Sequence, residues 1–256
     1  MSPVRLHAMA FTHRGAVRAT NEDTIAIGDW IPSAPMPAPV VLEHTVSAPL
    51  ICLVADGMGG HAAGEVASRT VAEHLTRRAA EATDEAAVAQ LLHEVNDELL
   101  ALMDQRPAWY GMGTTVAGVA VNPARVIVFN VGDSRVYRIE AGRLVQLSTD
   151  DTPGPKLPDG RTALYTSSII SQVLGGYGPD RPGERIVPHV LSESLADGAR
   201  YLICSDGLTD LLAPAAIEQL LVADDRARAV ALFEAAMARG GSDNISLLLL
   251  RVRQDS

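Results

Sequence analysis

Basic clusters and long apolar segments are scarce in this chain of 256 residues. Lysine and arginine number 21 against 31 acids, a net charge of −10, so a surface for nucleic acid or anionic membrane is disfavoured. No apolar stretch approaches the roughly 18–20 residues that a membrane span needs. The start, MSPVRLHAMAFTHRG, has no long apolar segment of the kind found in secretory signals. We therefore expect no nucleic-acid partner, no membrane span and no secretory signal.

Cysteine is equally scarce, with Cys52 and Cys204 as its two representatives. Both lie inside apolar runs, which predicts buried free thiols in a reducing compartment. No set of Cys and His residues has the spacing of a zinc site. We therefore expect a cytoplasmic location and no zinc.

Apolar residues make up 47% of the chain, which is enough to form the core of one large domain or of two small ones. The Pro-rich segment 31–49 is predicted to be an exposed loop between two strands, and 150–168 a second irregular, flap-like loop. Neither has the character of a domain linker, and no internal repeat is found. We therefore expect a single domain over residues 1–256.

The predicted elements are strands and helices that cluster separately, which favours antiparallel sheets covered by helices. The helix over 84–104 has an apolar stripe at helical spacing, a cap at Thr83 or Asp84, and Pro107 beyond its end. Ala141-Gly142 predicts a hairpin turn. The predicted strands are 6–12, 23–28, 50–55, 115–121, 125–131, 135–140, 143–147, 200–204 and 245–252, and the other helices are 62–80, 214–222 and 225–239.

Acidic residues stand at the ends of several apolar runs. Asp-Gly alone predicts a tight turn, and we interpret the pairs in LPDGRT (157–162) and LADGAR (195–200) in that way. Asp56 and Asp206 differ because each ends at least four apolar residues and no pairing strand follows directly. The full set is Asp56, Asp133 and Asp206 at strand ends, Asp243 before a strand, and Glu22 with Asp23 before another.

Neighbouring carboxylates at the ends of buried strands repel one another unless a cation neutralises them. Oxygen ligands without His or Cys select Mg²⁺ or Mn²⁺. Gly57 has no Cβ, so its carbonyl can approach an ion closely. Such clusters usually handle phosphate, and Arg18, four residues before Glu22, can hold phosphate oxygens with two hydrogen bonds. The alternative for Arg18 is an ordinary solvated side chain.

Six motifs occur together in one order, namely RATNED, VADGMGGHAAGE, GMGTTVAGVAV, VGDSRVY, SDGLTD and GGSDNISLLLLRV. In order and spacing they resemble the metal-dependent serine/threonine protein phosphatases of type 2C (PPM) in their bacterial form, from about residue 7 to 252. The resemblance implies an α+β fold, a four-layer αββα sandwich with two central antiparallel sheets flanked by helix pairs.

The resemblance also implies two Mn²⁺ or Mg²⁺ ions bridged by a water that attacks phosphoserine or phosphothreonine in proteins. Asp56 is expected to be shared by both ions, with the Gly57 carbonyl beside it. The remaining expectations are Asp206 and Asp243 as ligands, Glu22 and Asp23 acting through water, Arg18 on phosphate, Asp133 with Asp206 at a weaker third ion, and Asn244 orienting Asp243. The partners implied are phosphorylated proteins and a Ser/Thr kinase.

Two alternatives remain at this point, a catalytically inactive relative that binds phosphoproteins and a hydrolase of small phosphate esters. The filled ligand set argues against the first. No cysteine lies in a phosphate-cradling loop, which argues against the thiolate mechanism of tyrosine phosphatases.

Three departures from the family pattern concern the surroundings of the cluster. Met58 stands where eukaryotic members have a His that is a proposed general acid, and His61 is a candidate, although a structural role at the helix start is favoured. Relatives commonly have Asp-His-Ser where this chain has Asp150, Asp151 and Thr152. The following flap, helical in relatives, is predicted to be a turn-rich, mobile loop that shapes the substrate entrance.

Overall fold

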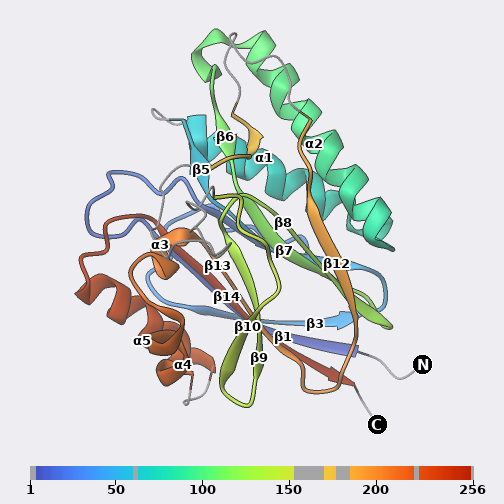
Figure 1. Cartoon of the computed structure of the whole chain (residues 1–256), viewed down its shortest axis with the longest axis vertical. Helices are drawn as coiled ribbons and strands as arrows, with labels where there is room; N and C mark the ends of the chain where they lie inside the picture. Colours follow the sequence, from blue (N-terminus) through green and yellow to red (C-terminus); the bar gives the residue numbers. More distant parts are fainter. Residues whose placement is uncertain (1–3, 60–62, 153–169, 177–184, 222–224, 255–256) are drawn as a thin grey trace, which may run out of the picture.

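Two antiparallel β-sheets packed face to face form the centre of this computed structural model (Figure 1). The structure describes residues 4–59, 63–152, 170–176, 185–221 and 225–254. The six-stranded sheet has the order β10 (Arg143–Gln146), β9 (Arg135–Glu140), β13 (Arg200–Cys204), β14 (Ile245–Gln254), β1 (Val4–His13) and β3 (Val40–Val46). The five-stranded sheet has the order β12 (His189–Ser194), β8 (Arg125–Val131), β7 (Val116–Val121), β4 (Leu50–Ala55) and β2 (Thr24–Ile27).

Helices cover the outer faces of both sheets. Helices α1 (Ala63–Arg77) and α2 (Glu85–Gln105) lie over the five-stranded sheet, whereas α4 (Pro214–Leu220) and α5 (Asp225–Ala238) lie over the six-stranded sheet (Figure 1). This arrangement confirms the predicted mixture of antiparallel sheets and helices and is consistent with a four-layer sandwich. The smaller elements are β5 (Gly57–Met58), β6 (Gly113–Thr114), β11 (Leu174–Gly175), α3 (Asp206–Thr209) and two 3₁₀ turns, Ala79–Glu81 and Pro107–Trp109.

Three local sequence patterns agree with the structure: an apolar run, a helix cap and a hairpin turn. The continuous apolar run of β4 is buried on both faces, because β4 is an interior strand of its sheet and lies between α1 and the second sheet. Asp84 caps α2 by accepting a hydrogen bond of 2.9 Å from the amide of Ala87, and the helix ends before Pro107 as predicted. The hairpin at Ala141-Gly142 is also confirmed, with φ of 48° and 80°.

The prediction of one continuous loop over 31–49 is wrong. Residues Val40–Val46 form β3, which pairs with β1 in the register Val4↔Val46. The segment VVLEHTV alternates between more and less buried positions, as expected for an edge strand with one covered face. The prolines before this segment led to the prediction of a loop, because proline is a stronger sign of a loop than a short alternation is of a strand.

Strand β12 was not predicted either, since HVLSES is only weakly apolar and its pairing with β8 is a long-range contact. The turn at 196–199 is confirmed by a hydrogen bond of 3.2 Å from the Ala199 amide to the Ala196 carbonyl. The Asp-Gly pair at 159–160 and most of the loop 150–168 lie outside the described residues.

Cys52 and Cys204 are buried free thiols. None of the helices within the described ranges is long and apolar enough to cross a membrane.

Candidate metal-dependent active site

One pocket of about 480 Å³ collects most of the predicted site residues at one end of the two sheets. Its walls come from the loop before β2, the end of β4, the start of α3 and the loop before β14. Asp23 and Asp133 lie outside its lining. The predicted residues that line it are Arg18, Glu22, Asp56, Gly57, Asp206, Asp243 and Asn244.

Asp56 is positioned by its main chain, at the point where β4 ends. Its carbonyl accepts hydrogen bonds from the Thr115 amide, at 2.9 Å, and from the Thr114 hydroxyl, at 2.8 Å. Burial raises the pKa of the Asp56 carboxyl well above its ordinary value, and the nearby charges of Asp23 and Asp206 raise it further. The fold therefore holds this carboxylate where a negative charge is costly without a cation.

Asp206 reaches the pocket from the six-stranded sheet. It is the first residue of α3 and follows two residues after the end of β13 at Cys204. Its carboxyl group lies within hydrogen-bonding reach of Asp56, so the two sheets meet here through their acids. Burial raises the pKa of Asp206, and its Oδ1 atom is buried without a hydrogen-bond partner. A buried oxygen of this kind calls for a cation or a proton.

Asp23 lies beneath the pocket and is 7% exposed. Its Oδ2 atom accepts a hydrogen bond of 2.9 Å from the Ser205 hydroxyl, whereas Oδ1 is buried and has no partner. Burial raises its pKa to about 7, opposed by hydrogen bonds from Ser246 and Ser205. Asp23 is therefore outside the lining of this pocket but close enough to Asp206 and Asp243 for their charges to raise its pKa.

Arg18 and Asp243 form an ion pair across the pocket. Arg18 Nη2 donates to Asp243 Oδ2 at 2.6 Å, and this hydrogen bond is the largest cause of the raised pKa of Arg18. The Arg18 side chain is 56% exposed, so most of its guanidinium faces the open side of the pocket. Arg18 thus lines the pocket and is also largely exposed to solvent.

Asn244 joins the loop that carries Arg18 to the loop before β14 that carries Asp243. Its Nδ2 atom donates to the carbonyls of Arg14, at 3.1 Å, and Thr20, at 2.9 Å. Its Oδ1 atom accepts a hydrogen bond of 2.8 Å from the Glu22 amide. The side chain is 5% exposed and fixes the whole of the loop 14–22, a wider contact than the orientation of Asp243 alone that the sequence predicted.

Asp133 follows β8 and lies beside the pocket. Its Oδ1 atom is buried without a partner, and burial raises its pKa to about 7, with a further contribution from Asp206. Asp150 and Asp210 also raise it, and neither was among the residues predicted from the sequence. Asp210 is the last residue of the motif SDGLTD, a signal that could have indicated it.

Asp150 and Asp151, which depart from the pattern that the resemblance implies, have separate contacts. Asp150 pairs with Arg135 at 2.6 Å. Asp151 accepts hydrogen bonds from the Gly132 amide, at 2.8 Å, and pairs with His189 Nε2 at 2.9 Å. The second aspartate therefore holds Gly132, the residue before Asp133, and connects it to β12 through His189.

The chemistry of the residues present fits hard divalent cations. All donors are oxygens, and buried oxygens without hydrogen-bond partners gather here on Asp23, Asp133 and Asp206. A Cβ at position 57 would lie 2.6 Å from the Glu22 carbonyl and 2.2 Å from the Gly64 carbonyl, so glycine is needed there. Among the described residues no three acidic, His or Cys side chains already converge as a metal-binding group. The Asp243 carboxylate is engaged with Arg18 instead.

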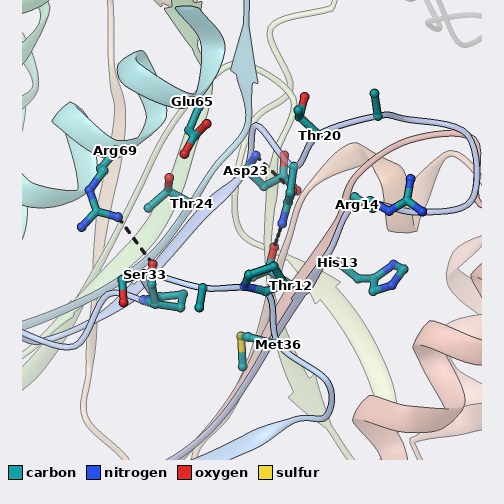
Figure 2. Close-up of a pocket in the computed structure, with 15 residues that line it drawn as sticks. Thr12, His13, Arg14, Thr20, Asp23, Thr24, Ser33, Met36, Glu65 and Arg69 are labelled. Atoms are coloured by element: carbon teal, nitrogen blue, oxygen red, sulfur yellow. Dashed lines mark hydrogen bonds between the residues drawn. The ribbon is translucent and has the colours of Figure 1, made fainter. Parts of the chain in front are cut away.

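A second pocket of about 400 Å³ lies behind the loop at 18–20, and Figure 2 shows its lining. It shares Ala19 and Thr20 with the first pocket and is lined on another side by Glu65 and Arg69 of α1. Arg69 Nη1 donates to the Pro32 carbonyl at 3.5 Å. From the acidic cluster this pocket reaches only Asp23, so we do not place the chemistry there.

The sequence model of the family described as protein phosphatase 2C matches residues 40–245. The chain is 32% identical over 258 residues to the serine/threonine protein phosphatase PstP of Mycobacterium tuberculosis, covering 96% of this chain and 45% of that protein. It is 30% identical over 261 residues to the serine/threonine phosphatase stp of Listeria innocua, covering 96% of this chain and 95% of that protein. The chain thus spans about half the length of PstP.

Solved structures agree with this assignment. The catalytic domain of PstP in complex with two manganese ions superposes with a TM-score of 0.79 at 30% identity, covering 98% of this chain and all of that one. The serine/threonine phosphatase of S. agalactiae superposes with a TM-score of 0.76 at 25% identity, covering 98% and 100%. This chain therefore belongs to the protein phosphatase 2C family, in its bacterial serine/threonine phosphatase form.

Proposed function

We propose that this chain is an active, metal-dependent phosphatase that hydrolyses phosphoserine and phosphothreonine in proteins. The observation that carries the proposal is the meeting of Asp56 and Asp206, from two different sheets, beside Arg18 in one open pocket. The manganese complex of the similar PstP domain supports a role for metal. The filled set of acids argues against an inactive phosphoprotein-binding relative.

The proposed ligands are those that the family resemblance implies, and most of them line the pocket. Asp56 is shared by two Mn²⁺ or Mg²⁺ ions, and the Gly57 carbonyl lies beside it. Bound ions supply the Lewis acidity that activates a water and offsets phosphoryl charge. The other proposed ligands are Asp206 and Asp243 directly, Glu22 and Asp23 through water, and Asp133 with Asp206 for a third, weaker ion.

Arg18 recognises the substrate in this proposal. Its exposed guanidinium forms two hydrogen bonds to the equatorial phosphate oxygens, whose charge it offsets. Asn244 keeps the Arg18 loop in register with Asp243. The leaving-group acid is not assigned, since Met58 lines the pocket and His61 lies outside the described residues.

The cellular setting follows from the chemistry. Phosphoprotein substrates imply a Ser/Thr kinase as the opposing enzyme, and two buried free thiols suit a reducing cytoplasm. We take residues 1–256 as one catalytic domain, because an apolar layer is shared by the two central sheets.

Metal removal and restoration test the proposal. Turnover of a phosphoserine peptide is expected to vanish after chelation and to return with Mn²⁺. Asp56→Asn should abolish it, because both ions lose a ligand, whereas Arg77→Gln, an exposed change on α1, should not alter it. Full activity after exhaustive chelation would contradict the metal mechanism. Faster turnover of phosphorylated metabolites than of phosphopeptides would favour a hydrolase of small esters.

A further inference from the structure

Three donors hold the carboxylate of Asp151 beside the strand end that carries Asp133. The Oδ1 atom of Asp151 pairs with His189 Nε2 at 2.9 Å. Its Oδ2 atom accepts hydrogen bonds of 2.8 Å from Gln172 Nε2 and from the Gly132 amide. The Asp151 side chain is only 11% exposed, so these donors, more than water, stabilise its negative charge.

The two side-chain donors are themselves fixed by β12 and the residues just before it. His189 is the first residue of β12 and lies opposite Asn130 of β8 in the sheet register. The side-chain amide of Gln172 is bound at both ends by Val187, whose amide donates to Oε1 at 2.9 Å and whose carbonyl accepts from Nε2 at 2.8 Å. Asp151 therefore contacts donors whose own positions are set by the sheet.

Asp151 in turn fixes Gly132, the residue directly before Asp133. Besides the contact with the Gly132 amide, the Asp151 amide donates to the Gly132 carbonyl at 3.0 Å. Gly132 has a φ of 99°, which favours glycine, and a Cβ there would lie 2.7 Å from the side chain of Thr115. Gly132 is thus packed between Thr115 and Asp151, and its place determines where Asp133 begins.

The residue after Asp133 is fixed as well, by a group that also supports Asp56. The hydroxyl groups of Ser134 and Thr115 share a buried hydrogen bond of 2.7 Å. The Thr115 amide donates to the carbonyl of Asp56 at 2.9 Å. Asp133 is therefore placed relative to Asp56 by contacts on both of its chain neighbours, with Thr115 on one side and Asp151 on the other.

We propose that Asp151, held by His189 and Gln172, is a positioning residue that places Asp133 to bind the weaker divalent cation at the edge of the active site. The inference rests on the proposed function, which assigns Asp133 to that cation. A cation held by few protein oxygens depends on the placement of each one. Removing a group that orients a metal ligand typically lowers metal affinity about 10- to 100-fold.

The test replaces His189, because its side chain is 33% exposed and its loss is less disruptive than that of the more buried Asp151. His189→Ala removes the Nε2 donor, whereas His189→Gln keeps an amide donor at a similar reach. The matched control is His74→Ala. His74 pairs with Glu98 at 2.6 Å between α1 and α2 and does not line the acidic pocket, so this variant also loses a histidine–carboxylate pair between two elements.

Mn²⁺ binding to the full chain is followed by electron paramagnetic resonance of free Mn²⁺, which needs no turnover. His189→Ala should bind the weak ion about tenfold more weakly. It should keep the two tight sites, because Asp56 has main-chain support from Thr114 and Thr115. kcat on a phosphoserine peptide should fall at limiting Mn²⁺ and recover at higher Mn²⁺, with KM unchanged. His189→Gln and the control His74→Ala should both bind Mn²⁺ like wild type.

A double variant shows whether the effect passes through Asp133. Added to Asp133→Ala, the change His189→Ala should cause no further loss of turnover, because residues that act through one another are not additive. A further loss there would overturn the proposal. So would wild-type affinity for the weak ion in His189→Ala, or loss of its tight sites.

Three more results would contradict the positioning role. These are an equal weakening in His74→Ala, no recovery in His189→Gln, and no weak Mn²⁺ site in wild type. Failure of the proposed function is seen separately, because wild type would then bind Mn²⁺ without Mn²⁺-dependent turnover of the phosphopeptide.

Discussion

At the scale of residues, the acids of the cluster differ in their surroundings. Asp23 and Asp133 have a pKa raised to about 7 chiefly by burial, and each has one buried oxygen without a partner. Asp243 is more exposed and is paired with Arg18. A bound cation would therefore stabilise the negative charge of the buried acids most. Asp243 would exchange its ion pair with Arg18 for a contact with the cation.

Asp133 does not line the pocket, but it is close enough to Asp206 for that charge to raise its pKa. We expect Asp133→Ala to retain the two tight Mn²⁺ sites and to lose most turnover, because the proposed third ion is held by few protein oxygens. Calorimetric Mn²⁺ titration together with phosphopeptide kinetics measures both. Loss of the tight sites would make Asp133 a structural ligand, and turnover like wild type would leave it as a residue that ends a strand.

Arg18 should behave differently from the metal ligands. Arg18→Ala removes a charged contact to phosphate in both the ground state and the transition state, so KM should rise about tenfold or more. Steady-state kinetics on a phosphoserine peptide, with Arg77→Gln as the matched control, measures the change. An unchanged KM would show that Arg18 serves only as the partner of Asp243.

At the scale of elements, the site depends on close contact between β5 and the start of α1. Gly57 and Gly64 approach so closely that a Cβ on Gly64 would lie 2.8 Å from the Gly57 carbonyl carbon. The same Cβ would be 2.2 Å from Glu22 Oε2. These two glycines let a helix, a strand and the Glu22 loop meet at one point, which brings the acids together.

Gly57→Ala should therefore harm both stability and metal binding. The added Cβ must displace backbone carbonyls, at a cost of about 1–3 kcal/mol in unfolding free energy. Mn²⁺ affinity should fall as well, because Gly57 is a proposed carbonyl ligand. Denaturant unfolding and Mn²⁺ titration measure the two effects.

The matched control is Gly198→Ala, where φ is +76° and no atom lies within 4 Å of the added Cβ. That variant should lose stability through backbone strain alone and keep its Mn²⁺ affinity. If Gly57→Ala and Gly198→Ala bind Mn²⁺ equally well, the close approach at Gly57 has no part in the site.

At the scale of the whole molecule, the acidic cluster joins the two sheets. Asp56 ends β4 of the five-stranded sheet, and Asp206 follows β13 of the six-stranded sheet. Ions shared by these residues would link the two layers at one end. We therefore expect metal binding to stabilise the fold as well as to support chemistry.

The stabilisation by Mn²⁺ should depend on pH with a defined sign. Folding raises the pKa of Asp23 and Asp133 from 3.8 to about 7, so between these values the metal-free folded state binds more protons than the unfolded state. The contribution of these groups to stability is then lost as pH rises from about 4 to about 7. Mn²⁺ replaces the protons, so the rise in melting temperature on adding Mn²⁺ should grow from pH 5 to pH 7.

Calorimetric melting with and without Mn²⁺ at pH 5, 6 and 7 checks this expectation. Asp133→Asn should reduce the pH dependence of the metal-free protein, because one of the buried acids with a raised pKa is removed. An Mn²⁺ effect that is constant across this range would show that the buried acids are not the groups that exchange protons for metal.

The sequence by itself determined the class of the site. Local motifs place Asp56, Asp206 and Asp243 at the ends of apolar runs, and oxygen-only chemistry then indicates hard cations and phosphate. The helix over 84–104 and the hairpin at Ala141-Gly142 were also predictable, because caps, stripes and turn residues act within a few positions.

Only the tertiary structure decided which distant segments meet. Strands β3 and β12 depend on partners far along the chain, so their weak local patterns did not identify them. The pairing of Arg18 with Asp243, the position of Asp210 near Asp133, and the alignment of Arg5 opposite Arg253 have the same origin. Strand register and the approach of loops arise from contacts over long sequence separations, which no local pattern of residues specifies.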